Sequence, residues 1–457
     1  TSSNAAPADA AVVDNTAPLP SFILKDISKM SDEDFIDMVQ HDSVMYFIDR
    51  ADPGTRLVGK GESTAVSLVG SNGFGLMAHC IAAERDWLTR EEAAERVLKI
   101  LDTFLNKASH FRGTFWWITD SATAQTNPYG GGYDVVETSY VCAGALVCKQ
   151  YFNGDSETEK KIRGHVDAIY ARVEFDAYLA DAKGYRRNTM AWTYDPVKKQ
   201  YSDFRIAGYH EAMITYIIAL GSPTHSIPDK CWEGWTGGYQ WKKIFGQEYF
   251  FCPALFTHQY TQAWMDLRNG QDAATRKKGI TYFENSKRAT LSHIAYAKKN
   301  PEKMPGYGPI WGLTDCGCPL HEHGFGGHGV PPSDWDLASD DGTVAFSAAG
   351  GSIVFTPKES IEFLRHVYTK FGDKIYDQWG FHDSMNVKTG WFAVEHDPLN
   401  KGAMICLIEN HRSGLIWKLF MQNAEVKNAM KKAGFQPVKT APKTKPSAPP
   451  KGKTGAI

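Results

Sequence analysis

The sequence predicts an all-α protein in which about ten to twelve helices, joined by long loops, form a helical barrel or solenoid. Three observations lead to this fold class. Apolar residues recur at helical spacing along most of the chain. The segments between these stretches are long and rich in glycine and aromatic residues. Nothing in the sequence matches a dinucleotide-binding or phosphate-binding glycine fingerprint, and no convincing short repeat is present.

The first predicted helix opens at Ser31, which three acidic residues follow in the first turn. Its buried stripe is expected to contain Phe35, Met38, Val39, Tyr46 and Phe47. The same periodicity predicts further helices over 64–85, 89–108, 135–153, 156–178, 209–221, 256–269, 273–299, 358–371 and 422–433. The intervening loops cover 111–133, 185–207, 228–253, 305–357 and 376–404. Loops of this length in a compact domain usually carry function.

Composition limits the kinds of partner. The net charge is −2 and the body of the chain has no basic stripe, which argues against a nucleic-acid partner. No apolar run reaches the ~20 residues of a membrane span. Residues 1–21 are small and polar, as in a linker left after a signal peptide is removed, so we expect a periplasmic or secreted protein. Residues 437–457 are rich in proline and lysine and are expected to be disordered. Residues 22–436 then form one domain, expected to be monomeric.

Aromatic residues are abundant, with 13 tryptophans, 20 tyrosines and 24 phenylalanines. They fit either a large core or platforms on which sugar rings stack, and composition alone favours neither.

Asp134 and Glu137 stand three residues apart, directly before an apolar helical stretch. This spacing lets both carboxylates point the same way. It is also the spacing of a capping box, which the pattern alone favours. Both interpretations hold together if a capped helix start fixes an acid at an active site.

Glu211 lies at the start of the apolar segment 209–221, which Gly221 and Pro223 end. A helix start lowers a carboxyl pKa, whereas a general acid needs a raised one, so burial and neighbouring acids would have to outweigh the dipole. A glycosidase uses such acids in pairs: one protonates the leaving oxygen, and in the inverting geometry a second activates water from about 6.5–9.5 Å away.

Many separate motifs between about residues 60 and 436 occur together and in a fixed order. They are found at 66–77, 134–138, 210–225, 255–260 with Trp264, Asp266 and Arg268, 285–288, 311–314, 341–344, 348–357, 379–383 and 408–417. In this arrangement the chain resembles the glycoamylase-like family, which contains bacterial endo-β-1,2-glucanases and is similar to a domain of cyclic β-1,2-glucan synthases.

The resemblance implies an (α/α)6 barrel and anomer-inverting hydrolysis of β-1,2-glucan without a metal or other cofactor. It implies that Glu211 is the proton donor and that Asp134 and Glu137 line the same site, serving the nucleophilic water or holding substrate hydroxyls. Asp383 and Asp397 are further candidates for the base. The motifs and the aromatic loops also predict the following substrate-contacting residues: Trp116, Trp117, Trp192, His210, His258, Tyr260, Trp264, Arg268, Trp311, Asp315, Asp383 and Trp391. A satisfied core role is an equal alternative for His258 and Tyr260.

Two segments depart from the family's pattern. Phe115-Trp-Trp-Ile-Thr-Asp120 places aromatic residues where the family tends to carry a histidine. The loop 314–328 is unusually rich in cysteine and histidine, which puts the linkage, the chain length and endo or exo action in doubt. Its candidate zinc ligands are Asp315, Cys316, Cys318, His321, His323 and His328, but their spacing matches no standard finger, so sugar or main-chain contacts are the favoured interpretation.

Other expectations concern structure and rival functions. Cys142 and Cys148 are expected in the core, a Cys231–Cys252 disulfide is possible, and Glu409 is expected to anchor a salt bridge. The rivals to an endo-glucanase are an exo-acting, sophorose-releasing enzyme, another β-glucan specificity, and a non-catalytic glucan-binding protein.

Overall fold

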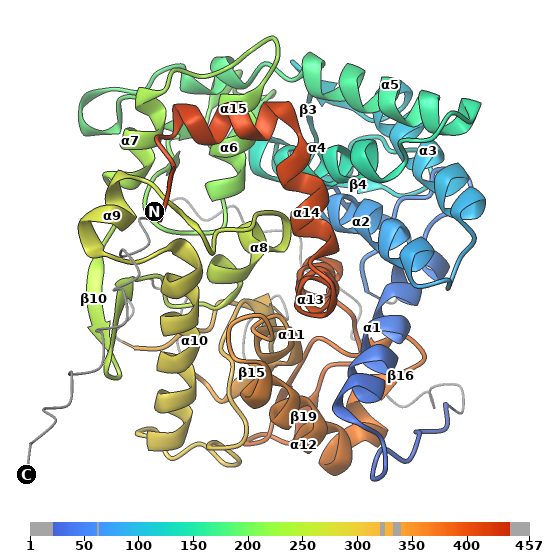
Figure 1. Cartoon of the computed structure of the whole chain (residues 1–457), viewed down its shortest axis with the longest axis vertical. Coiled ribbons are helices and arrows are strands. Elements are labelled where there is room, and N and C mark those ends of the chain that lie inside the picture. The colour runs from blue at the N-terminus through green and yellow to red at the C-terminus, as the bar shows by residue number, and fades with distance from the viewer. Residues whose placement is uncertain (1–21, 62–63, 320–324, 332–339, 439–457) are drawn as a thin grey trace, which may run out of the picture.

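The computed structural model describes residues 22–61, 64–319, 325–331 and 340–438, and helices are its main regular elements (Figure 1). The expected linker 1–21 and residues 439–457 of the expected tail lie outside the described residues. Among the helices described, none combines the length and the apolar run that a membrane crossing requires.

One set of helices is buried along nearly its whole length. They are α2 (Ser71–Glu84), α4 (Val135–Tyr151), α6 (Met213–Gly221), α8 (Phe256–Trp264), α11 (Phe346–Gly350) and α13 (Pro398–Arg412). α2 packs against both α4 and α13, α4 packs against α6, and α13 also packs against α8 and α11. A helix with neighbours on every side has no exposed polar face. The polar side chains of α8 and α13 are accordingly buried, and Gln259 and Asn410, for example, donate to main-chain carbonyls.

A second set buries one face and exposes the other. It contains α1 (Asp32–Asp49), α3 (Arg90–Asn106), α5 (Glu157–Arg172), α7 (Lys230–Thr236), α10 (Tyr282–Lys299) and α12 (Pro357–Ile375). In Figure 1, α3, α5, α10 and α12 lie towards the rim, whereas α8 and α13 lie near the centre. Shorter helical segments are α9 (Ala273–Lys278), α14 (Leu415–Gln422), α15 (Ala424–Lys432), η1 (Phe175–Leu179) and η2 (Gly184–Arg186).

The amphipathic helices were predicted well. α1 begins after Ser31, whose side chain accepts the N–H of Asp34, and the five expected apolar residues of its stripe are buried. α3 carries a full capping box between Thr89 and Glu92. Glu409 forms the expected buried ion pair, 2.9 Å from Arg85. The two helix caps are local, so neighbouring sequence specifies them, whereas the partner of Glu409 comes from a distant segment.

The expected helix boundaries differ from the structure where loops enter. Residues 66–68 form a strand, so the helix expected over 64–85 begins at Ser71. The segment 273–299 is divided at Gly279, which has φ +66° and ends α9. Much of α13 falls within the predicted loop 376–404, because its buried sequence lacks the polar face that marks a surface helix. α7 and α11 also lie inside predicted loops.

The strands are short antiparallel pairs within the loops. The pairs are β1 (Val66–Leu68) with β4 (Ile118–Asp120), β2 (His110–Phe111) with β3 (Thr114–Phe115), β6 (Met190–Ala191) with β9 (Arg205–Ile206), β10 (Trp241–Ile244) with β11 (Gln247–Phe250), β12 (Gly270–Gln271) with β20 (Gln436–Pro437), β13 (Cys316–Gly317) with β14 (Phe325–Gly326), and β16 (Tyr376–Asp377) with β17 (Gly380–Phe381). Two sheets have three strands: β5 (Tyr133–Asp134), β7 (Thr193–Asp195) and β8 (Gln200–Tyr201); and β15 (Thr343–Ala345), β18 (Ser384–Asn386) and β19 (Trp391–Phe392).

These sheets hold the segments that lead into buried helices. β5 runs directly into α4 and β15 runs directly into α11. The expected domain end at 436 is too early, because Pro437 pairs with Gly270 and the N–H of Val438 donates to Asn269. The suggested Cys231–Cys252 disulfide is wrong, because both thiols are free and buried. Cys142 and Cys148 are core residues, as expected.

Candidate active site

Glu211 lies in the turn before α6, two residues ahead of its first helical residue. Its main-chain oxygen accepts a hydrogen bond from the Thr261 hydroxyl of α8 at 3.0 Å. Its carboxylate lies 3.6 Å from Nδ1 of His210, and its side chain keeps 13% of its surface exposed. The α8 contact fixes the main chain while leaving the carboxyl group accessible.

Asp134 and Glu137, here called the α4 acids, begin α4. Asp134 is the N-cap: its Oδ1 accepts the N–H groups of Val136 and Glu137 at 2.8 and 2.9 Å. Its Oδ2 accepts the indole N–H of Trp192 at 2.8 Å. Glu137 does not close the capping box. It accepts the N–H of Gly70, at the start of α2, at 2.6 Å.

Gly70 is required for this contact, because a Cβ atom there would collide with the Glu137 carboxylate. The helix cap expected at Asp134 is therefore present. Glu137 points towards the start of α2.

Burial raises the pKa of Asp134 to about 7, and the charge of Glu211 adds to the effect against the opposing N–H and indole hydrogen bonds. Burial likewise raises the pKa of Glu137 well above its usual range, with further contributions from Asp134, Asp397 and Glu211. Neither carboxyl group is an ordinary ionised helix cap.

Asp383 and Asp397, here called the α13 acids, lie near the start of α13. Asp383 follows β17 and accepts the N–H of Gly317 at 2.6 Å and the side-chain amide of Asn400 at 3.2 Å. Asp397 is the N-cap of α13 and accepts the N–H of Asn400 at 2.9 Å. Burial, followed by the charge of Asp397, raises the pKa of Asp383 to about 7.

Asp315 and Tyr260 lie between these two groups. Burial and then the charge of Glu211 raise the pKa of Asp315 to about 7. The Tyr260 hydroxyl donates to the Asn400 side chain at 3.0 Å. Burial raises the pKa of this phenol well above its usual range, and the acids that raise it further are Asp397, Glu137, Glu211 and Asp315. Acids from four separate segments therefore converge around one buried tyrosine.

This arrangement is suited to general acid–base chemistry at neutral pH. Crowded, buried carboxyl groups cannot all ionise together, so the group holds protons that isolated acids would have lost. The same site can then present a protonated acid and an ionised base.

Comparison with known proteins places this site in a family. The glycoamylase family model, described as "Putative glucoamylase", matches residues 203–424. An endo-β-1,2-glucanase of Chitinophaga pinensis, solved with sophorotriose and glucose, is 30% identical with a TM-score of 0.81; the match covers 89% of this chain and 99% of that one. This chain belongs to the glycoamylase-like family.

Two relatives from Parabacteroides distasonis extend the comparison. A β-1,2-glucanase structure is 27% identical with a TM-score of 0.81, covering 89% of this chain and 60% of that chain. An exo β-1,2-glucooligosaccharide sophorohydrolase acting at the non-reducing end is 29% identical over 440 residues, which is 88% of this chain. The chain spans only 58% of the length of that curated relative.

In this glycoamylase-like protein, several predicted substrate contacts border the acids. Trp192, which binds Asp134, stacks on His210 with ring centroids 5.8 Å apart. His210 also lines a pocket with Tyr209, Gln240 and Cys252.

The remaining loop tryptophans lie partly or largely at the surface. Trp116 is half-buried and donates to the Asn127 carbonyl at 3.0 Å, whereas 39% of Trp117 is exposed. Trp391 is half-buried in β19.

Three of the predicted contacts are buried core residues in the structure, which for His258 is the alternative that the sequence left open. Trp264 is fully buried and packs between Phe74 and Tyr140 at ring distances of 4.6 and 5.4 Å. Trp311 is 3% exposed, and His258 is buried with Nε2 against the Cys252 carbonyl. Each faces the space between helices, which spacing in the sequence does not distinguish from a binding surface.

Arg268 is engaged in contacts within the protein. It binds both oxygens of Asp266 at 2.8 and 2.7 Å and lies over the Trp417 ring. It follows the C-terminal end of α8, whereas the acids lie at the N-terminal ends of buried helices. This Arg268–Asp266 pair is therefore structural.

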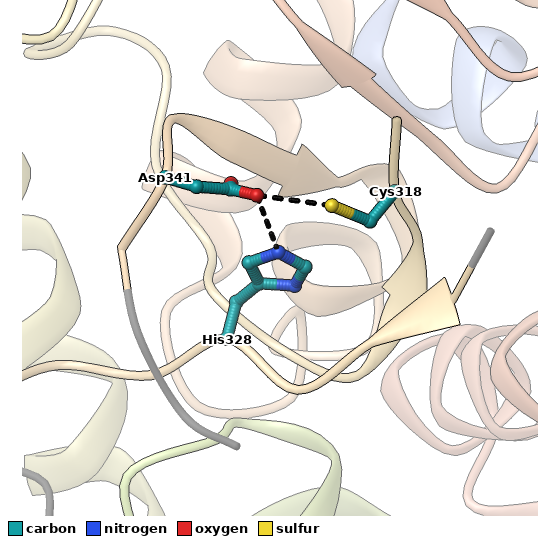
Figure 2. A group of neighbouring side chains, drawn as sticks. All are labelled: Cys318, His328 and Asp341. Atoms are coloured by element: carbon teal, nitrogen blue, oxygen red, sulfur yellow. Dashed lines mark hydrogen bonds and ion pairs between the residues drawn. The ribbon is translucent and has the colours of Figure 1, made fainter. Parts of the chain in front are cut away.

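The cysteine- and histidine-rich loop forms a compact group with an acid that the sequence did not single out (Figure 2). The Asp341 carboxylate accepts the Cys318 thiol at 2.9 Å and lies 3.2 Å from Nε2 of His328. Burial lowers the pKa of His328, but the hydrogen bond and charge of Asp341 outweigh it, so the net pKa is raised. His321 and His323 lie outside the described residues.

A second buried group was also missed. Asp377, His382 and His396 gather where β16, β17 and the segment before α13 meet. A signal was present in the sequence, because each histidine directly precedes one of the α13 acids.

Proposed function

We propose that this protein is a glycoside hydrolase that cleaves β-1,2-glucan with inversion at the anomeric carbon. The observation that carries the proposal is the position of Glu211, a carboxyl group with 13% of its side chain exposed that lies close enough to Asp134, Glu137 and Asp315 to interact electrostatically with all three. A partly exposed carboxyl group among acids that hold protons at neutral pH is suited to protonate a leaving oxygen. The names of the relatives supply the substrate class.

Glu211 acts as the proton donor, and Asp397 acts as the base that activates water. Asp134, Asp315 and Asp383 have pKa values raised to about 7, and burial raises the pKa of Glu137 well above its usual range, so these four retain protons that a base must lack. Among the two N-cap acids, Asp134 has hydrogen bonds to both carboxylate oxygens, whereas Asp397 accepts only the Asn400 N–H among the described residues. Asp397 therefore keeps an oxygen for water.

The finer architecture is proposed to be an (α/α)6 barrel. Its inner ring is α2, α4, α6, α8, α11 and α13, and its outer ring is α1, α3, α5, α7, α10 and α12. Packing supports the contacts α2–α4, α4–α6, α11–α13 and α13–α2. The Thr261 hydroxyl accepts the Ile214 N–H between α8 and α6, and Gln259 donates to the Ala348 carbonyl between α8 and α11. The acids then sit at one mouth of the ring.

Exo action is the second candidate, because one relative is an exo-acting sophorohydrolase. Endo and exo action are distinguished by the products that they release first. The test is incubation of purified protein with linear β-1,2-glucan, with products followed by chromatography and the first anomer by NMR. Mixed short oligosaccharides of α-anomer support an endo enzyme, and sophorose alone from the first minutes supports exo action.

The absence of cleavage, with an active β-1,2-glucanase as positive control, would contradict the substrate assignment. A binding protein is distinguished by Glu211→Gln: an enzyme loses turnover and keeps its affinity for glucan, whereas a binder has no turnover to lose.

A further inference from the structure

Two buried histidines converge on one carboxylate behind the α13 acids. Nδ1 of His382 lies 2.7 Å from the Ala393 carbonyl, and Nδ1 of His396 lies 3.1 Å from the Phe381 carbonyl. A carbonyl oxygen can only accept, so both Nδ1 atoms carry the proton. The Nε2 atoms of His382 and His396 lie 3.5 and 3.1 Å from the same Oδ2 of Asp377.

This geometry leaves an electrostatic conflict. A neutral imidazole protonated at Nδ1 presents a lone pair at Nε2, and a carboxylate oxygen also presents lone pairs. Nε2 of His382 has no hydrogen-bond partner among the described residues, and none of its side chain is exposed. Two lone pairs aimed at a carboxylate in a buried site repel one another unless positive charge lies between them.

Protons are a poor source of that charge. Protonating both rings would place two imidazolium ions with centroids 5.0 Å apart against one carboxylate. The Lys401 ammonium is close by, donating to the carbonyls of Trp379 and Phe381 at 2.8 and 2.7 Å. A single divalent cation satisfies both Nε2 lone pairs and the carboxylate without further protons.

We propose that Asp377, His382 and His396 bind a divalent transition-metal ion, with zinc as the best match to two imidazole nitrogens and one carboxylate oxygen. The two Nδ1–carbonyl hydrogen bonds are the outer contacts that orient metal-binding imidazoles. Asp377 and His396 line a pocket with Arg50, Trp379 and Glu395, which gives an ion a route in and a water a place to complete the coordination.

The ion has a structural role and lies behind the acids. His382 and His396 directly precede Asp383 and Asp397, so a metal bound to both rings would tie the two α13 acids to a common anchor. This inference goes beyond the proposed function and does not depend on it. The Cys318–His328–Asp341 group differs, because only one imidazole faces the carboxylate there. Nδ1 of His328 lies 3.2 Å from the Thr314 carbonyl and Nε2 lies 3.2 Å from Asp341, and protonation of this single ring, whose pKa Asp341 raises, supplies the positive charge.

The test measures metal content of the full chain by inductively coupled plasma mass spectrometry after dialysis, together with the melting temperature before and after chelation. We expect one zinc per chain, a lower melting temperature after prolonged chelation, and recovery when zinc is returned. Replacement by Co2+ should give the visible absorption of a bound cobalt ion. This readout in the unmodified chain does not rely on any variant folding.

Variants then locate the ion. His396→Gln and Asp377→Asn should lose the zinc, and their far-UV circular dichroism reports whether they fold. The matched control is His79→Gln, because His79 is also buried with Nδ1 against a carbonyl, that of Gly75 at 2.7 Å. Cys318→Ser should keep the zinc.

Two results would overturn the proposal. One is a wild-type chain that neither holds nor takes up zinc and whose melting temperature is unaffected by chelation. The other is zinc that is lost in Cys318→Ser and kept in His396→Gln. Metal content is measured without glucan, so failure here and failure of the hydrolase assignment are separate outcomes.

Discussion

The α4 acids and the α13 acids face the same site but are built differently. Asp134 and Glu137 come from one helix start and are held by main-chain N–H groups and one indole. Asp383 and Asp397 are 14 positions apart. Asp397 caps its own helix, whereas Asp383 accepts the N–H of Gly317, which lies in β13. Behind them stand two histidines, which the α4 acids lack among their described contacts.

This difference shows two ways of keeping an acid buried. Contiguous residues can hold a carboxylate through the free N–H groups of a helix start. Residues gathered from several loops need an additional anchor, because each loop has freedom to move. The α13 acids should therefore depend on their surroundings more than the α4 acids do.

The largest effect should come from Glu211→Gln, which removes the proposed proton donor. We expect turnover of β-1,2-glucan to fall by about 10³-fold or more, the upper range for general acid catalysis, with binding retained. Single-turnover assays and calorimetric titration with glucan measure the two quantities. Glu233→Gln, at an exposed position on α7, is the matched control and should be active. Retained turnover in Glu211→Gln would remove this residue from the mechanism.

The next effect separates the two N-cap acids. Asp397→Asn should lower turnover by about 10²-fold or more, because asparagine still caps α13 but cannot accept a proton from water. Added azide should restore part of the activity by replacing the activated water. Asp134→Asn should not respond to azide. Rescue of Asp134→Asn instead of Asp397→Asn would transfer the role of base to the α4 acids.

A third prediction concerns stability and pH. The pKa of Asp383 is raised from 3.8 to about 7 in the folded protein, so folding favours its protonated form. This contribution is complete below pH 4 and is lost as the pH rises to about 7, at a cost on the order of 4 kcal/mol.

Thermal unfolding from pH 4 to 8 measures this contribution. Asp383→Asn should show a shallower fall in melting temperature than the wild type, and Asp134→Asn a similar change, since the pKa of Asp134 is also raised to about 7. Parallel curves for variant and wild type would show that Asp383 does not titrate in this range.

The smallest effect should come from Trp192→Phe. It removes one hydrogen bond to Asp134 and preserves the aromatic ring beside His210. An ordinary hydrogen bond contributes about 0.5–1.5 kcal/mol, so we expect kcat/KM to fall by roughly twofold to tenfold. Trp117→Phe, at a partly exposed ring, is the control and should change kcat/KM by less than Trp192→Phe. Equal losses would mean that ring shape, and not the bond to Asp134, is what matters.

The histidine pair sets the α13 acids apart in these experiments as well. If zinc anchors Asp383 and Asp397, its removal by a chelator should lower turnover, which requires Asp397 as the base. The hydrogen bonds that hold Asp134 should be unchanged. If chelation disturbed the α4 acids as much as the α13 acids, the two groups would depend on the same structural anchor.

Sequence determined those parts of the protein that depend on neighbouring residues. The one-sided helices α1 and α3 and the cap at Asp134 follow from local spacing, because a helix buries residues three or four positions apart. Glu211 was singled out by the family motif, and it lies in the turn before α6. The motif order also placed the chain in its family.

Tertiary structure decided whatever depends on residues distant in sequence. It placed Trp264 and Trp311 in the core, turned Glu137 towards Gly70, and brought His382 and His396 to Asp377. The physical reason is that burial and charge act through space. A carboxyl pKa of about 7 at Asp383 arises from neighbours on other segments, and no local pattern reports their distance.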